Sequence, residues 1–427
     1  MDWILLLIFA FFFAMIAFGV PISYSMGLTG LIYILIQDIP IVMTAQRFFS
    51  NTQSFSFLAV PFFILAGSLM VEAGIAKRII HFADVLVRAL PGGLACVSVV
   101  TSMIMAGVSG SSVADAASVG GILIPEMKRK GYDDSFNVAI NATSSVVGII
   151  IPPSSTMIII AWITGLSVAK MFMAGAIPGI LIGLMYLVIT VIISKKRNYP
   201  REKAATPREI LIAVKETGWA LLLPVILIGS IVFGIATPTQ SASLSALYAL
   251  VLGLFVYRTL DFKAVVRALK ETAKSTTSVM MVVCSASIFQ WVLVHENIPQ
   301  MISGALLGLN LPSWALLIVM VMILFVAGMV MDNVPNLFIF LPIFMPIATS
   351  LGVDPIQFSI VMLVSLALGL FTPPVGTTLF ISCNIAKISI EECIKDLIPF
   401  FIGGAIIVIL TLFCPPITMW LPTLMFG

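Results

Sequence analysis

The sequence contains few charged residues and almost no histidine. Of its 427 residues, 10% are Asp, Glu, Lys or Arg, whereas a soluble domain carries about 25%. The net charge of +3 is too small to indicate a nucleic-acid-binding protein. Two histidines argue against a His-based metal site or haem. The five cysteines show no CxxC pair or zinc spacing, so we expect ordinary reduced thiols.

Apolar residues take the place of the missing charges. They make up 60% of the chain, the mean hydropathy is +1.16, and long apolar runs recur from end to end. About 20 apolar residues cross a bilayer as a helix, so we predict a polytopic, all-α membrane protein. The predicted spans lie near 3–19, 22–36, 57–72, 172–194, 218–236, 241–257, 275–294 and 398–421.

Four segments do not fit a simple span. Segments 92–127 and 312–348 are too short for two crossings and carry small and polar residues in the middle, which predicts re-entrant hairpins. Segments 135–163 and 355–384 are too long for one straight span, and each contains a Pro-Pro pair that breaks a helix. We therefore predict two discontinuous helices whose irregular backbone is buried in protein or lines a wet cavity.

The basic residues predict the orientation. If loop 195–217 is cytoplasmic, 20 of the 22 Lys and Arg residues fall on the inner side and only Arg47 and Lys170 on the outer side. This distribution follows the positive-inside rule and places both termini outside. Segment 73–91 is basic and amphipathic, which suits a cytoplasmic surface helix, whereas segment 295–311 lacks Lys and Arg and suits the outer face.

The unusual segments occur twice at a constant spacing. A shift of 221 residues places Pro152-Pro153 on Pro373-Pro374, and an ungapped match extends over residues 90–183 of the first copy. In the predicted orientation, hairpin 92–127 enters from the cytoplasm and hairpin 312–348 from outside. The two copies are therefore inverted repeats, which are typical of membrane transporters.

The hairpin tips and helix breaks concentrate polar groups that can bind ions. The tips lie at 106–112 and 328–336, and the breaks at 151–156 and 372–378. Carbonyls freed by the breaks, together with hydroxyls and a carboxylate, are hard oxygen ligands that suit a small cation. The positive N-terminal ends of the half-helices suit an anionic substrate. The glycines allow the backbone to approach closely.

Two acids are predicted to lie well inside the membrane. Asp332 lies at the second hairpin tip, and we expect a functional role rather than simple capping. Asp115 lies beyond the first tip, where capping, hydrogen bonding between helices and function stay equally open. The first tip also contains the GxSG pattern of intramembrane serine proteases, but neither histidine is placed to act as the base that Ser109 would need.

These segments resemble the large membrane subunit of TRAP transporters, the DctM/SiaM type, and above all its sialic acid members, although C4-dicarboxylate members share the motifs. The resemblance rests on the inverted hairpins, on GVSGSSVADAASVGGILIPEM (107–127), on IIPPSS (150–155) and on LFTPPVGTTLF (370–380), and it covers essentially the whole chain.

The resemblance implies a multi-pass protein of the bacterial inner membrane that is an elevator-type secondary transporter and not an enzyme. The implied cargo is an organic acid, foremost sialic acid (N-acetylneuraminate), imported with sodium ions (Na+). It also implies two partners: a small four-helix membrane subunit and a soluble periplasmic substrate-binding protein.

The resemblance further implies the site residues. It places one sodium ion between the first tip and the first break, and a second between the corresponding segments of the second repeat. The implied sodium ligands are Gly107, Ser109, Ser112, Pro152, Ser155, Gly328, Asp332, Thr372, Gly376 and Thr377. The implied substrate-binding residues are Ser109, Ser111, Ser154, Ser155, Thr156, Asp332 and Asn333. No Lys or Arg is predicted at that depth, so an anionic substrate would depend on helix dipoles, hydroxyls and the bound sodium ions.

The repeats also predict a division of the chain into a fixed scaffold and a moving transport core. We expect segments 1–91 and 195–311, with the scaffold helices, the cytoplasmic loop and the two surface arms, to stay fixed in the lipid bilayer. Segments 92–194 and 312–427, with the hairpins and broken helices, would form the transport core. Three alternatives stay open: a stand-alone sodium–dicarboxylate symporter of similar design, proton coupling through Asp332, and a purely structural membrane scaffold.

Overall fold

The computed structural model describes residues 3–52, 55–308 and 311–427, and these residues form helices and short connections without a strand. Seven of the described helices are long and apolar enough to cross a membrane, or eight if one bent pair counts as a single span. Helix α10 (Val168–Lys196) exposes an apolar residue every fourth position, at Ile180, Leu184, Val188 and Ile192. Such an apolar stripe suits contact with lipid. The prediction of an all-α polytopic membrane protein is confirmed.

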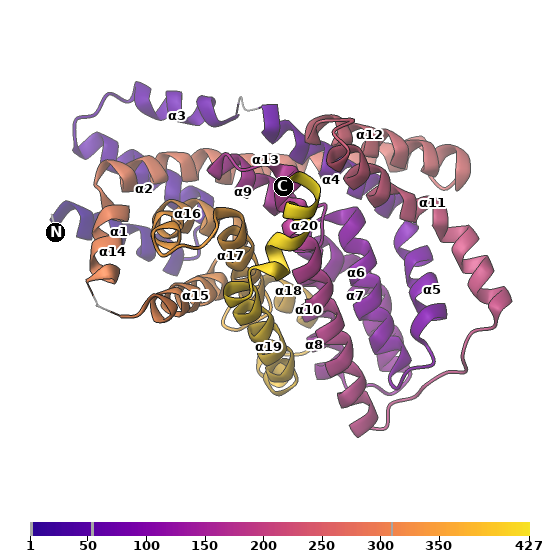
Figure 1. Cartoon of the computed structure of the whole chain (residues 1–427). Coiled ribbons are helices and arrows are strands. Elements are labelled where there is room, and N and C mark those ends of the chain that lie inside the picture. Colours follow the sequence, from indigo (N-terminus) through magenta and orange to yellow (C-terminus); the bar gives the residue numbers. More distant parts are fainter. Residues whose placement is uncertain (1–2, 53–54, 309–310) are drawn as a thin grey trace.

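The helices of segments 1–91 and 195–311 pack mainly on one another. The long helix α13 contacts α2, α3 and α4, and α4 also packs along α12 (Figure 1). Helix α5 bends away from α4 by 72° and packs on α11. The bounds are α1 (Trp3–Ala17), α2 (Ile22–Ile36), α3 (Val42–Thr52), η1 (Phe55–Leu58), α4 (Ala59–Glu72), α5 (Ile75–Val87), α11 (Pro207–Val232), α12 (Pro238–Val251), the π-helical η3 (Leu252–Val256), α13 (Phe262–His295) and α14 (Ile298–Leu307).

The other two segments contain the hairpins and broken helices. Helices α6 (Gly93–Ser109) and α7 (Ser112–Arg129) form the first hairpin, and α15 (Ser313–Val330) and α16 (Asn333–Ser350) form the second. The first broken helix comprises α8 (Asp134–Ser145), η2 (Val146–Ile149) and α9 (Ser155–Thr164), and the second comprises α17 (Pro355–Gly369) and α18 (Thr377–Ala386). Helices α10, α19 (Ile390–Phe413) and α20 (Pro416–Phe426) complete this part.

The helix boundaries reproduce the repeat found in the sequence. Helix α7 begins at Ser112 and α16 at Asn333, and α8 begins at Asp134 and α17 at Pro355. Each of these pairs has the same spacing as the two Pro-Pro pairs. The two predicted hairpins and the two predicted discontinuous helices are therefore confirmed.

The two repeats interlock through their broken helices. Helix α18 of the second repeat packs against α7 and α8 of the first. The Asn141 side-chain amide of α8 donates hydrogen bonds to the Ala116 carbonyl at 3.0 Å and to the Ser382 hydroxyl at 2.8 Å. At the end of α10, the Arg197 guanidinium pairs with Asp133 at 3.0 Å and with Asp396 of α19. These contacts join hairpin, broken helix and following span into one packed unit.

Some predicted boundaries are wrong. The span predicted at 398–421 ends at Phe413, and α20 is a separate helix because Pro415-Pro416 interrupts the chain. Helix α13 begins at Phe262, not near residue 275, and Asp261 caps its first turn. The loop predicted at 195–217 is helical at both ends, and a capping box at Thr206 begins α11. Helix α3, which packs along α13, was not predicted.

Glycines let the second hairpin and the second broken helix approach closely. A Cβ atom added to Gly369 of α17 would lie 2.2 Å from the carbonyl carbon of Gly328 in α15. A Cβ atom added to Gly328 would lie 2.8 Å from the Leu366 carbonyl oxygen. The clash in both cases is with backbone, which cannot rotate away.

We predict that Gly369→Ala destabilises the protein, because the added methyl group forces the two backbones apart. Overpacking of this kind costs about 1–3 kcal/mol, measurable as a lower melting temperature of the purified protein in detergent. Gly121→Ala is the matched control, because Gly121 lies on the exposed face of helix α7 with open space around it, and alanine there should not destabilise. Equal melting temperatures for Gly369→Ala and wild type would contradict the close contact.

Candidate functional site

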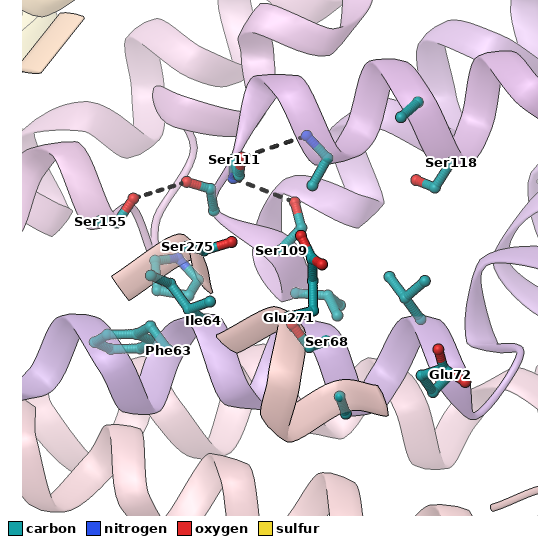
Figure 2. A pocket seen from close by; sticks show the side chains of 18 of the residues that line it. Phe63, Ile64, Ser68, Glu72, Ser109, Ser111, Ser118, Ser155, Glu271 and Ser275 are labelled. Carbon is teal, nitrogen blue, oxygen red and sulfur yellow. Dashed lines mark hydrogen bonds between the residues drawn. The ribbon is translucent and has the colours of Figure 1, made fainter. Parts of the chain in front are cut away.

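A cavity of about 500 Å³ separates α4 and α13 from the tip of the first hairpin. Its lining includes Phe63, Gly67, Ser68 and Glu72 of α4, Ser109, Gly110, Ser111 and Ser118 of the hairpin, Pro153 and Ser155 of the break, and Ala268, Glu271, Ser275 and Val279 of α13. Figure 2 shows the hairpin serines and Ser155 on one side of this cavity and the α4 side chains on the other. The size suits a small organic molecule.

The first hairpin turns within two residues and leaves its hydroxyls facing the cavity. Gly110 has a φ of 58°, and a Cβ atom there would lie 2.8 Å from the Pro153 carbonyl oxygen. Ser111 is the N-cap of α7 and accepts a hydrogen bond from the Ala114 amide at 3.4 Å. The Ser109 hydroxyl accepts one from the Ser111 amide at 3.3 Å. The positive end of the α7 dipole therefore points at the tip.

The first break meets this tip directly. The Ser155 hydroxyl donates a hydrogen bond to the Gly110 carbonyl at 3.2 Å. The buried Ser154 is the N-cap of α9, and its hydroxyl donates to the Ile149 carbonyl at 2.7 Å and accepts from the Met157 amide. Two helix N-termini, those of α7 and α9, thus lie side by side at the hairpin tip. Together they form an environment that stabilises negative charge.

Asp115 is a buried carboxylate behind the first tip. One of its oxygens, Oδ1, accepts a hydrogen bond from the Ser109 hydroxyl at 2.6 Å. The other oxygen, Oδ2, is buried and has no hydrogen-bond partner among the described residues. A Cβ atom on Gly148 would lie 2.5 Å from Oδ2, so only a glycine at this position lets the carboxylate come so close. A buried carboxylate oxygen without a partner, next to hydroxyl and carbonyl oxygens, fits a small cation.

The second tip has the same construction but different side chains. Asp332 is the N-cap of α16, and its carboxylate accepts a hydrogen bond from the Asn333 amide at 2.8 Å. The Asn336 side-chain amide donates to the Met331 carbonyl at 3.0 Å and to the Asp332 carbonyl at 3.1 Å. Asp332 is exposed, and it does not line the cavity described above.

The second break contacts this second tip through backbone. The Val375 amide donates to the Met329 carbonyl at 3.3 Å. Gly376, with a φ of 48°, precedes α18, and the Thr377 hydroxyl is buried without a hydrogen-bond partner in the described part of the chain. The Thr372 hydroxyl donates a hydrogen bond to the Leu368 carbonyl at 2.7 Å. An unpaired hydroxyl beside backbone carbonyls offers neutral oxygen ligands, whereas the first site also contains the charged carboxylate of Asp115.

The residues predicted from the sequence fall into three groups. Ser109, Ser111 and Ser155 line the cavity. Gly107, Ser112, Pro152, Ser154 and Thr156 are buried behind them. Gly328, Asp332, Asn333, Thr372, Gly376 and Thr377 belong to the second tip and break, away from the cavity lining. The structure thus brings each tip to its own break.

The residues of α4 and α13 that form the cavity wall opposite the hairpin tip were not predicted from the sequence. Glu271 of α13 points toward the hairpin tip in Figure 2, and Glu72 of α4 pairs with Arg267 at 2.8 Å near the same end. No Lys or Arg lines this cavity. Ala268, Glu271 and Ser275 follow a helical spacing on one face of α13, and this stripe of small and polar residues was the signal available in the sequence.

The fold and the site together define a membrane transporter built from inverted repeats, with its polar groups at broken helices. The family model of the DctM component of tripartite ATP-independent periplasmic (TRAP) transporters matches residues 9–417. The chain therefore belongs to this family, whose members are bacterial inner-membrane transporters, not enzymes. In the general arrangement of the family, the large permease works with a small membrane subunit and a periplasmic binding protein.

Two curated relatives and one solved structure show how far the similarity extends. The C4-dicarboxylate TRAP transporter large permease DctM of Vibrio cholerae is 36% identical over 99% of this chain and 98% of its own length. The sialic acid TRAP transporter large permease SiaM of the same organism is 34% identical over 96% of each chain. The YdaH transporter of Alcanivorax borkumensis shares the fold, with a TM-score of 0.64 and 15% identity over 86% of both chains.

We predict that Ser109→Ala destabilises the protein, because it removes the hydrogen bond that holds the buried Asp115 carboxylate. A hydrogen bond to a charged group is worth about 1.5–3 kcal/mol, so the melting temperature should fall. Ser118→Ala is the control, because Ser118 lines the same cavity but bonds only to the Asp115 main-chain carbonyl at 3.5 Å. A Ser109→Ala protein as stable as the Ser118→Ala protein would contradict the role of this bond.

Proposed function

We propose that this protein imports an organic acid together with sodium ions, as the large subunit of a TRAP transporter that works by an elevator mechanism. The observation that carries this proposal is the cavity at the first hairpin tip. It combines two helix N-termini and three serine hydroxyls with the partner-free carboxylate oxygen of Asp115 directly behind them.

The chemistry of the tip favours an anion bound next to a cation. The N-termini of α7 and α9 contribute partial positive charge. The Ser111 hydroxyl accepts from the Ala114 amide and keeps its hydrogen for an anion, whereas Ser109 and Ser155 donate theirs to Asp115 and to the Gly110 carbonyl. A sodium ion beside Asp115 would neutralise the carboxylate and present positive charge to the substrate. An empty site would leave the carboxylate unpaired close to an anion, so the two ligands favour each other's binding. This mutual dependence is what coupled transport requires.

Sodium fits the available ligands better than a softer ion. The described residues hold no group of three or more His, Cys, Asp or Glu side chains that could bind a transition metal. The first tip offers a carboxylate, hydroxyls and backbone carbonyls, all hard oxygen ligands. The partner-free Thr377 hydroxyl at the second break supports a second sodium site there.

One helix contact between scaffold and core supports the elevator mechanism, whereas the ion pair of Lys130 with Glu202 and the hydrogen bond from Tyr132 to the Pro200 carbonyl involve the loop that connects the two parts. Hairpin helix α6 meets α11 where Gly107 faces Pro224, a contact without hydrogen bonds or ion pairs among the described residues. The cavity lies at the ends of α4 and α13 that the basic residues assign to the cytoplasm. Under this proposal the structure corresponds to the inward position of the core, and the outward position would require the core to slide along the scaffold.

The substrate is proposed only as a small organic acid. Sialic acid, which the sequence motifs favour, and C4-dicarboxylates both carry the carboxylate that the tip would bind. The cavity shows no Lys or Arg that would select between them. A weakly selective membrane site suits a system in which a periplasmic binding protein chooses the substrate.

We predict that proteoliposomes containing this chain and a small membrane subunit take up labelled sialic acid or succinate. Uptake should require both an inward sodium gradient and the loaded binding protein. Uptake with sodium alone would favour a stand-alone symporter, and uptake that follows a pH gradient and is lost in Asp332→Asn would favour proton coupling. No uptake of any organic acid would overturn the proposal.

We predict that a disulfide between α6 and α11 stops transport by fixing the core. In a Gly107→Cys/Pro224→Cys protein the two Cβ atoms would start 3.0 Å apart, about 0.5 Å below the range found in disulfides, so a small separation of the two helices would allow the bond to form. Uptake should fall to background after oxidation and return after reduction. The reduced double variant is the reference, and full uptake by the oxidised protein would contradict the elevator mechanism.

A further inference from the structure

A second cavity, of about 330 Å³, lies between the scaffold and the core. Arg47 of α3 and Gln290, Trp291 and Ser287 of α13 line its scaffold side, and Trp162 of α9 and Phe338 of α16 line its core side. Figure 1 shows α3 running beside α13, with α9 and α16 close to the same helix. The hairpin tip serines are not part of this cavity, so it is a separate site.

The charge-based orientation places this cavity on the outer side. Arg47 is one of only two Lys or Arg residues assigned to the outer face. Trp162 lies near the end of α9 that leads to the outer loop with Lys170. A substrate arriving from outside would meet this cavity before it reaches the hairpin tip.

The polar groups of the cavity suit a carboxylate. The Arg47 guanidinium has five N–H donors, so it can pair with a carboxylate through two parallel hydrogen bonds and still keep an interaction that it already makes within the protein. Gln290 makes no hydrogen bond within the part of the chain that the structure describes, so its amide is available. The Ser287 hydroxyl donates its hydrogen to the Val283 carbonyl at 2.6 Å, so it can only accept a hydrogen bond, for example from a hydroxyl group of the substrate.

Aromatic side chains hold the walls of the cavity in place. The Trp162 ring contacts the Phe57 ring of η1 at 5.4 Å and the Phe338 ring at 5.8 Å between centroids. The Trp291 ring stacks on His295 at 4.8 Å. Fixed aromatic walls with a few polar groups are typical of binding sites for small molecules.

The two cavities lie along the same pair of helices. On α9, Ser155 lines the inner cavity and Trp162 the outer one, about 10 Å apart along the helix at 1.5 Å per residue. On α13, Val279 lines the inner cavity and Ser287 the outer one, about 12 Å apart. Sliding the core by about this distance would move the serine tip, which faces Glu271 in this structure, to a position opposite Val279, and would leave about 12 Å between the tip and Ser287.

We propose that the outer cavity is the first binding site of the organic acid on its way in, with Arg47 pairing with the substrate carboxylate. This inference rests on the proposed function and deepens it. Arg47 and Gln290 hold the carboxylate on the scaffold, Ser287 can accept from a hydroxyl of the substrate, and the hairpin tip takes the substrate over when the core is in its outward position. The inner cavity has the opposite charge, because Glu271 and Glu72 line it. Fixed charges of this kind accelerate capture outside and release inside without changing the equilibrium set by the gradients.

The test is initial uptake by proteoliposomes, with the complete transporter and a saturating sodium gradient, as a function of the concentration of substrate-loaded binding protein. Arg47→Gln should raise the half-saturating concentration at least about tenfold, since a lost hydrogen-bonded charge pair is worth more than the about 1.4 kcal/mol that a factor of ten represents. Arg47→Lys should restore part of the loss. Lys170→Gln, which removes the other outer charge away from the cavity, should stay within about twofold of wild type.

A second variant separates a substrate site from a docking contact for the binding protein. Gln290→Leu removes an amide inside the cavity, between the helices, and should also raise the half-saturating concentration by severalfold. An effect of Arg47→Gln without an effect of Gln290→Leu would overturn the proposal, because it indicates a surface contact with the binding protein. Equal effects of Arg47→Gln and Lys170→Gln would overturn it as well. Failure of the wild type to take up any organic acid would instead mark a failure of the proposed function itself.

Discussion

The carboxylate of Asp115 is buried under the first hairpin tip, where only one of its two oxygens has a hydrogen-bond partner among the described residues. A buried, half-satisfied carboxylate is costly unless a cation or a proton completes it. The residues around the carboxylate have the arrangement expected of a cation-binding site. Ser109 orients the carboxylate, Gly148 lets it approach the backbone closely, and the N-termini of α7 and α9 point their dipoles at the same tip.

This arrangement depends on interrupting helices inside a membrane protein. Backbone groups freed by a break must find partners within the protein, because lipid offers none. The structure meets this need by pressing each hairpin tip against a break, with Ser155 bonding Gly110 in the first repeat and Val375 bonding Met329 in the second. Glycines at the closest approaches allow this contact, as at Gly328 and Gly369. The groups that are still unpaired are then available to ions and substrate.

The hairpins, the breaks and the repeat could be predicted from the sequence because each has a local cause. Pro-Pro pairs break helices wherever they occur, and polar residues in the middle of an apolar segment are unusual enough to locate the tips. The pairing of tip 109–111 with break 153–155 followed from the repeat and the family resemblance. The facing wall could not be predicted in the same way, because Glu271 and Ser68 belong to helices whose neighbours depend on tertiary packing. Helix α3 was missed because its short amphipathic sequence is stabilised mainly by contact with α13.

The most direct test of sodium binding needs neither transport nor partner proteins. The melting temperature of the purified protein can be compared in sodium chloride and in potassium chloride at the same ionic strength. A ligand that binds only the folded state stabilises it in proportion to the logarithm of its concentration above the dissociation constant. We predict that sodium raises the melting temperature above its value in potassium, and that Asp115→Asn removes most of this difference. Equal melting temperatures in the two salts would contradict a sodium site at the hairpin tip.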